Sequence, residues 1–335
     1  MAKISKDEKL VLYRRELLSK GYRIISGKIF DKNNEEIKYQ DFRAKLMCEY
    51  AEPVSFIEDL IDELFALGSY DNWPELNIVK EAKEIGPITK DMEEAKNAPF
   101  QLEPKQYLIL NRLLYHPEDE VIFITTGIGC SGKSTFLNII KQLFDNDYSS
   151  ASLSDLSNDF TVAEAVKHRL ICSDELAKGE LDCKVLKQLA SKQTMFVNPK
   201  HKTGYPTKTQ SALFWCCNKA PKIDATDTGI LRRIIFYSRN TVIENPDPSL
   251  NHKEYTKEEL LWFARRALAY ERSDWKNYFI AETHSIIMKD NSVAMYLKKS
   301  TYETYRNMCV VNGLRPYSEP NWRELRDLFV EWQKL

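Results

Sequence analysis

Four short apolar runs of strand length occur in the middle of the chain, and segments with helical periodicity separate them. The runs are EVIFITT (120–126), RLICSDEL (169–176), SALFWCCN (211–218) and IIFYS (234–238). Their β-branched and aromatic residues favour strands, and the spacing of apolar residues after the first run favours a helix. The pattern predicts an α/β core in this part of the chain.

Helical periodicity dominates the flanking sequence. Residues 7–22 have helical spacing with Gly21 as a stop, and residues 54–68 predict an amphipathic helix closed by Gly68. Between them, residues 22–40 predict a hairpin whose turn is KNNE. After the core, residues 256–275 predict an amphipathic helix, and residues 290–332 three short helices broken at Gly313 and Pro316. We therefore expect an N-terminal accessory or collar domain (1–95), a core (96–245) and a C-terminal helical region (246–335).

The composition is that of an ordinary globular protein. The 335 residues are 43% hydrophobic and 29% charged, and the net charge of −1 gives no global attraction to nucleic acid. The N-terminus lacks the apolar core of a signal peptide, and no apolar run approaches membrane-spanning length. The seven cysteines follow no paired or metal-ligand spacing. These features predict a reducing cytoplasm, that of the host cell if a virus or phage encodes the chain.

The first apolar run leads directly into a phosphate-binding motif. Residues 127–134 match G-x-x-x-x-G-K-[ST] in full, and a helical pattern follows. Lys133 is expected to reach the β- and γ-phosphates of a nucleotide, and the Ser134 hydroxyl to bind Mg²⁺. A chance match in a glycine-rich turn is disfavoured, because the chain has only 11 glycines. The predicted nucleotide-binding residues are Gly127, Gly129, Ser131, Gly132, Lys133, Ser134 and Thr135.

Two acidic residues end the second apolar run. A carboxylate at the tip of a buried strand beside a phosphate loop can hold the metal ion, and a neighbouring one can accept a proton from the attacking water. On this reasoning Asp174 is a metal ligand and Glu175 is the general base. The alternative is that both residues only cap the helix that follows.

Polar residues also mark the third and fourth runs. Asn218 ends the third run, where its amide could orient a water against the γ-phosphate. Arg232 and Arg233 precede the fourth run, and such arginines suggest an arginine finger. The alternatives are a turn residue before Pro221 for the asparagine and a solvated charge pair for the arginines.

A basic hairpin is predicted between the second and third runs. Its strands are Thr194–Val197 and Thr207–Phe214, and TGYP (203–206) forms the turn. From Asn198 to Asn240 the chain carries eight Lys or Arg against two acidic residues. The basic residues nearest the turn are Lys200, His201, Lys202 and Lys208. The alternative is a lysine-rich exposed hairpin that has no ligand.

The order of these motifs resembles that of superfamily 3 helicases of the AAA+ class, especially the helicase part of phage, plasmid and poxvirus primase-helicases. The resemblance covers about Gln106–Arg239. It implies a P-loop NTPase core with a parallel sheet flanked by helices, and a hexameric ring with ATP between subunits. In the family the finger acts in trans and immediately precedes the strand, which implies Arg233, with Arg232 as the second candidate. It also implies that the hairpin enters the central pore and that its basic residues bind the DNA backbone.

The resemblance predicts an ATP-dependent DNA helicase that replicates a virus, phage or mobile element, with ATP and Mg²⁺ as cofactors. Its expected partners are single-stranded or forked DNA, further copies of the chain, and a separate primase or other replication proteins, with no membrane. The C-terminal helices would form a lid and either a winged-helix-like module or a plain packing domain. The alternatives are an origin-binding initiator that uses ATP only to assemble, a DNA-packaging motor, and a small-molecule kinase.

Overall fold

The fold was analysed in a computed structural model of the chain. The structure describes residues 5–25, 28–33, 35–67, 75–174, 183–198, 200, 204–221, 223, 227–290, 301–311, 316, 318–320, 322–323 and 326–327.

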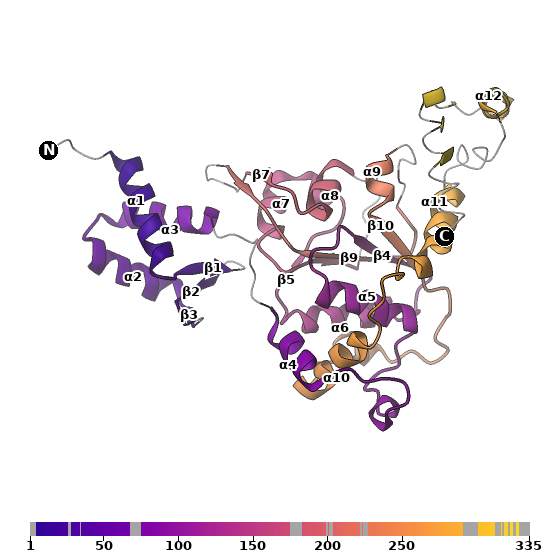
Figure 1. Cartoon of the computed structure of the whole chain (residues 1–335), viewed down its shortest axis with the longest axis horizontal. Coiled ribbons are helices and arrows are strands. Elements are labelled where there is room, and N and C mark those ends of the chain that lie inside the picture. Colours follow the sequence, from indigo (N-terminus) through magenta and orange to yellow (C-terminus); the bar gives the residue numbers. More distant parts are fainter. Residues whose placement is uncertain are drawn as a thin grey trace.

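A parallel sheet of five strands forms the centre of the protein (Figure 1). In spatial order the strands are β10 (Ile234–Ser238), β4 (Ile122–Thr126), β9 (Ala212–Cys217), β6 (Leu170–Ser173) and β5 (Tyr148–Ser150). Every neighbouring pair is parallel. Because parallel strands end at the same edge of a sheet, the segments after β4, β6, β9 and β10 all leave from one edge.

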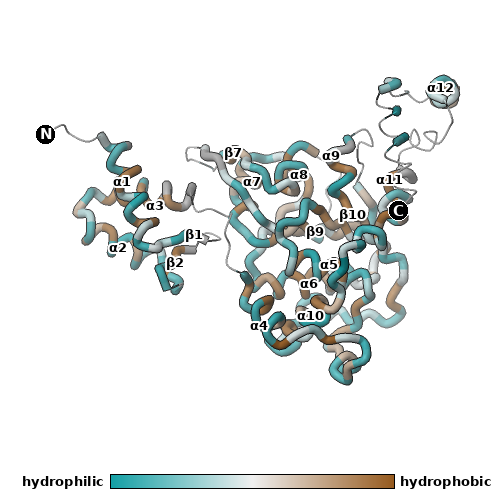
Figure 2. The backbone as a smooth tube through the Cα atoms, viewed as in Figure 1, coloured by the Kyte–Doolittle hydropathy of each residue, from teal (hydrophilic) through white to brown (hydrophobic). Residues whose placement is uncertain are grey.

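Helices cover both faces of this sheet, which explains why its strands are apolar at almost every position. Successive residues of β4 face opposite sides: Phe123 packs with one apolar cluster, and Ile122 and Ile124 pack with the other. The first face is covered by α4 (Asn77–Ile85), α5 (Pro104–Tyr115), α6 (Lys133–Leu143) and α10 (Lys257–Leu268). The second is covered by α7 (Asp159–Ala165), α8 (Cys183–Ala190) and α9 (Thr228–Leu231), and Figure 2 shows hydrophobic stretches between these layers.

The predicted α/β core with its flanked parallel sheet is confirmed. All four apolar runs contain strands, and β10 has the predicted bounds. The predicted strand Thr207–Phe214 is wrong, because this segment contributes to two sheets. Its beginning belongs to β8 (Tyr205–Thr207), which pairs with β7 (Met195–Val197), and its end belongs to β9. The edge strand β5 is short and half exposed, and its sequence gave no strand signal.

The N-terminal residues build a small mixed α/β unit with its own core. It contains α1 (Lys6–Ser19), β1 (Arg23–Ile25), β2 (Lys28–Phe30), β3 (Glu36–Ile37), α2 (Tyr39–Tyr50) and α3 (Val54–Leu67). Leu17, Phe42 and Leu60 are fully buried in one cluster. Helix α1 ends at Ser19, two residues before the predicted stop at Gly21, whose φ of 85° lies in the left-handed region. Strands β2 and β3 pair antiparallel, and the predicted KNNE turn falls between them, with Asn34 outside the described residues.

The segments that adjoin the core pack closely against it. Residues of α4 share the apolar cluster of α10, although the predicted boundary at residue 95 places α4 in the N-terminal domain. Helix α11 (Asn277–Asp290) contributes to both clusters, through Phe279 on one face and Ile287 on the other. The remaining elements are the 3-10 helices η2 (Glu93–Lys96), η3 (Asp155–Ser157) and η4 (Pro248–Asn251), and α12 (Tyr302–Val311). The domain boundaries themselves stay predictions.

Among the residues that the structure describes, no helix combines the length and apolar character needed to cross a membrane.

Candidate functional site

The phosphate-binding motif joins the end of β4 to the start of α6, as the sequence predicts. Gly132 caps α6 at its N-terminus with φ 79°, and Gly127 has φ 142°, so both lie where side chains are strained. A Cβ atom on Gly127 would lie 1.9 Å from the carbonyl oxygen of Arg239. Glycine at 127 is therefore required by the close approach of the segment after β10, independently of any ligand.

The Lys133 side chain is buried beneath the loop. Its ammonium group donates hydrogen bonds to the carbonyl oxygens of Gly127 (2.9 Å) and Ile128 (2.6 Å) and to Ser131 Oγ (3.2 Å). Burial lowers the pKa of Lys133, and the positive charge of Arg239 lowers it further. The loop thus places a buried cation at the N-terminus of α6, which carries positive potential of its own.

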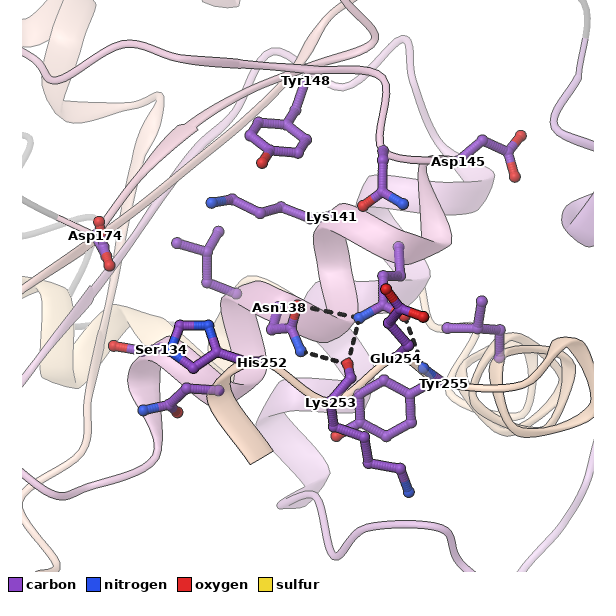
Figure 3. A pocket seen from close by; sticks show the side chains of 15 residues that line it. Ser134, Asn138, Lys141, Asp145, Tyr148, Asp174, His252, Lys253, Glu254 and Tyr255 are labelled. Atoms are coloured by element: carbon purple, nitrogen blue, oxygen red, sulfur yellow. Dashed lines mark hydrogen bonds between the residues drawn. The ribbon is translucent and has the colours of Figure 1, made fainter. Parts of the chain in front are cut away.

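Ser134 and Asp174 face a common cavity of about 960 Å³ beside α6 (Figure 3). Both side chains are exposed to solvent. A hydroxyl and a carboxylate are hard oxygen donors of the kind that Mg²⁺ prefers. The two residues that the sequence analysis assigned to a metal ion therefore line one cavity, and their donor chemistry suits such an ion.

Asn218 follows β9 directly, between the strands that carry the loop and Asp174. Strand β9 pairs with β4 on one side and with β6 on the other, and adjacent strands lie about 4.8 Å apart. The sheet thus brings the loop, Asn218 and Asp174 to one edge in that order. Glu175, the predicted general base, lies outside the described residues.

The residues after the motif bind the segment that leads to α10. Thr135 Oγ1 donates a hydrogen bond of 2.7 Å to Asn251. Asn138 and Gln142 donate to the Lys253 carbonyl oxygen at 2.9 and 2.8 Å. Helical spacing puts these side chains on one face of α6. The motif predicts a nucleotide-binding role for Thr135, and the contact of Thr135 with Asn251 puts the segment before α10 next to the motif.

The two adjacent arginines have opposite environments. Arg233 is 6% exposed, and its guanidinium group binds Glu120 Oε2 (2.7 Å) and the Gly229 carbonyl oxygen (2.7 Å) of the same chain. Arg232 is exposed to solvent. Both precede β10, whose register with β4 puts them at the edge of the sheet opposite the loop. Five residues of strand separate the two edges, a distance of about 16 Å.

The predicted basic hairpin corresponds to β7 and β8, with Val197 opposite Tyr205. Met195 and Val197 anchor it in the core, whereas Phe196 on the other face is 64% exposed. Lys200 and Lys208 are exposed. His201 and Lys202 lie outside the described residues.

The sequence analysis did not single out Arg239, the residue directly after β10. Its backbone N–H donates to the Thr126 carbonyl oxygen at 2.7 Å, so it lies beside the end of β4. The signal that could have identified Arg239 is its position directly after an apolar strand, the same position that marks Asp174 and Asn218. The partner that buries Arg233, Glu120, was missed because it lies far away in sequence.

Residues 125–233 match one family model. Its description is "Family of unknown function (DUF5906)". The matched segment runs from β4 to the residue before β10 and contains the loop, Asp174, Asn218 and both arginines. No curated protein matches this chain.

Solved structures similar to this chain include the apo NrS-1 C-terminal region, with TM-scores of 0.47 and 0.48 and identities of 16% and 18%. The chain spans 65% of the length of each of these structures, which cover 76% of it. The JCV helicase is similar at a TM-score of 0.34 and 12% identity, covering 82% of this chain and 83% of that one. The fold assignment itself rests on the strand order and the flanking helices described above.

Proposed function

We propose that this protein is an ATP-dependent DNA helicase that works as a homohexameric ring in the replication of a virus, phage or mobile element. The observation that carries the proposal is the arrangement at one edge of the sheet. There a phosphate loop with a buried lysine stands beside Asn218 and Asp174, in the order that nucleotide hydrolysis needs.

The proposed chemistry assigns a task to each residue at that edge. The loop amides and Lys133 bind the phosphates of ATP, and a Mg²⁺ ion held by Ser134 and Asp174 would neutralise charge on them. Asn218 orients the attacking water, and Glu175 accepts its proton. Lys133 exchanges its bonds to the loop carbonyls for bonds to phosphate oxygens when ATP binds.

An assembly of several chains is supported by the position of the arginines. They lie at the edge of the sheet opposite the loop of their own chain, so a finger from this segment acts on a nucleotide bound to a neighbour. Arg232 is exposed and available for that role, whereas Arg233 is held by Glu120. We therefore assign the finger to Arg232 and a structural role to Arg233.

The DNA-binding proposal rests on the hairpin. Lys200 and Lys208 are exposed, and the core anchors their hairpin through Met195 and Val197. Lysine contacts with phosphates bind DNA without reading its sequence, which suits a translocating enzyme. His201 and Lys202 are assigned to the same surface.

The proposal is tested by strand displacement from a labelled forked DNA with ATP and Mg²⁺. The expected result is ATP-dependent unwinding by the wild-type protein and none by Lys133→Ala, which loses the phosphate-binding cation. Robust ATP hydrolysis by a ring without unwinding would contradict the helicase proposal and favour an initiator or packaging motor.

A further inference from the structure

The Arg239 guanidinium group is buried beside the phosphate loop and is only partly satisfied. Its side chain is 9% exposed, and Nη2 pairs with Glu103 Oε1 at 3.2 Å. Within the described part of the chain, the buried Nε and Nη1 atoms have no hydrogen-bond partner. A buried donor without an acceptor costs free energy, more so when the group is charged. Such a group suggests an acceptor that comes from elsewhere.

Nη1 faces the last glycine of the loop. A Cβ atom on Gly132 would lie 3.3 Å from Arg239 Nη1 and 3.3 Å from Ile243 Cδ1. The Ile243 backbone N–H in turn donates to the Cys130 carbonyl oxygen at 3.0 Å. The loop itself and the half-buried Ile243 side chain therefore lie next to the unsatisfied Nη1. Lys133 has to leave the loop carbonyl oxygens when phosphate binds, so the loop next to Nη1 rearranges when the nucleotide binds.

The topology of the sheet indicates which phosphates Arg239 would reach. Asn218 and Asp174, to which the proposed function assigns the γ-phosphate and the metal ion, follow strands on one side of β4. Arg239 follows β10, the strand on the other side of β4. It therefore approaches the loop from the flank away from the γ-phosphate.

We propose that Arg239 is a nucleotide-binding residue that donates hydrogen bonds to the α- or β-phosphate, the part common to ADP and ATP. This inference rests on the proposed nucleotide site. An arginine suits the role because its planar group presents donors at fixed angles and keeps its charge when it is buried. Glu103 balances part of the guanidinium charge through Nη2.

Calorimetric titration of the full chain with ADP and with ATP tests the inference. Arg239→Met is expected to weaken the binding of both nucleotides by the same factor, about 10–100-fold. Arg239→Lys should recover part of the loss, because it restores the charge without the fork of donors. Glu103→Gln is the matched control, since it removes the same ion pair while leaving Arg239 intact.

The outcomes separate the possible failures. Equal losses in Arg239→Met and Glu103→Gln would show that only the ion pair matters, and a loss for ATP but not ADP would contradict the placement. Unchanged affinity in Arg239→Met, with tight binding by the wild type, would overturn this inference alone. Failure of the wild type to bind either nucleotide would overturn the proposed function as well.

Discussion

Lys192 shows how a single residue tunes the stability of this fold. Its ammonium group donates a hydrogen bond of 2.7 Å to the Ser211 carbonyl oxygen, just before β9 begins. Burial lowers the pKa of Lys192 to about 8, although the nearby charges of Asp119 and Glu120 act in the opposite direction. The folded protein therefore releases this proton at a lower pH than the unfolded chain does.

Lys192→Met is expected to change how stability depends on pH. Between a folded pKa of about 8 and an unfolded value of about 10.4, the unfolded chain holds one more proton, so wild-type stability rises with pH in that window. The variant should lack this rise, about 1–2 kcal/mol for a partly buried group. Urea unfolding midpoints from pH 7 to 10 measure it, with exposed Lys208→Met as control. Parallel curves for wild type and Lys192→Met would contradict the assignment.

At the scale of elements, one side of α6 connects the loop to the segment that precedes α10. Thr135, Asn138 and Gln142 bind residues of the stretch from Asn251 to Tyr255, immediately before α10 begins. Figure 3 shows part of this contact, the hydrogen bond from the Asn138 side chain to the Lys253 carbonyl oxygen. The segment before α10 therefore contacts α6 within one helical turn of the loop, at Thr135, and again further along the helix.

The β7–β8 hairpin gives the prediction at this scale. Replacing both Lys200 and Lys208 by alanine should lower the affinity for single-stranded DNA about tenfold, and basal ATP hydrolysis should persist. The slope of log affinity against log salt should fall by about 1.4, because each lost phosphate contact contributes about 0.7. Fluorescence anisotropy at several salt concentrations measures both. A Lys90→Ala, Lys96→Ala double variant, which removes two exposed lysines elsewhere, should bind like the wild type; an equal loss there would contradict a DNA-binding hairpin.

At the scale of the whole molecule, Arg232 and Arg233 have different expected roles: Arg232 acts on a neighbouring chain, and Arg233 stabilises its own chain. Arg232→Ala should bind ATP normally and lose hydrolysis by about 10³-fold, the size of an arginine-finger effect. Arg233→Ala should instead lose about 1–3 kcal/mol of folding stability, because Glu120 and the Gly229 carbonyl oxygen lose their donor. ATPase assays and thermal unfolding distinguish the two. Full activity in Arg232→Ala would contradict the finger.

Mixing two inactive variants tests action across the interface. Lys133→Ala and Arg232→Ala should regain hydrolysis together, because a chain with an intact loop then meets a neighbour with an intact arginine. In a randomly mixed ring roughly a quarter of the interfaces would be complete. The absence of any recovery after subunit exchange would contradict an arginine supplied by a neighbour.

The sequence by itself determined the local features of this protein. The apolar runs specified four strands, since residues buried on both sides must be apolar at nearly every position. The motif at 127–134 specified the strand–loop–helix unit, because its glycines and lysine are needed at fixed positions whatever surrounds them. Asp174 and Asn218 were found for the same reason, since each directly follows a recognisable strand. Local spacing was sufficient for all of these.

Only the tertiary structure decided which distant residues meet. The order of the strands put Arg239 beside Gly127 and placed Arg232 and Arg233 at the opposite edge from the loop. Glu120, 113 positions from Arg233, decided which of two identical adjacent side chains is buried. The split between β8 and β9 likewise depended on which partner strands were available. Pairing between segments far apart in sequence leaves no local pattern, so the environment of each arginine emerged only from the folded chain.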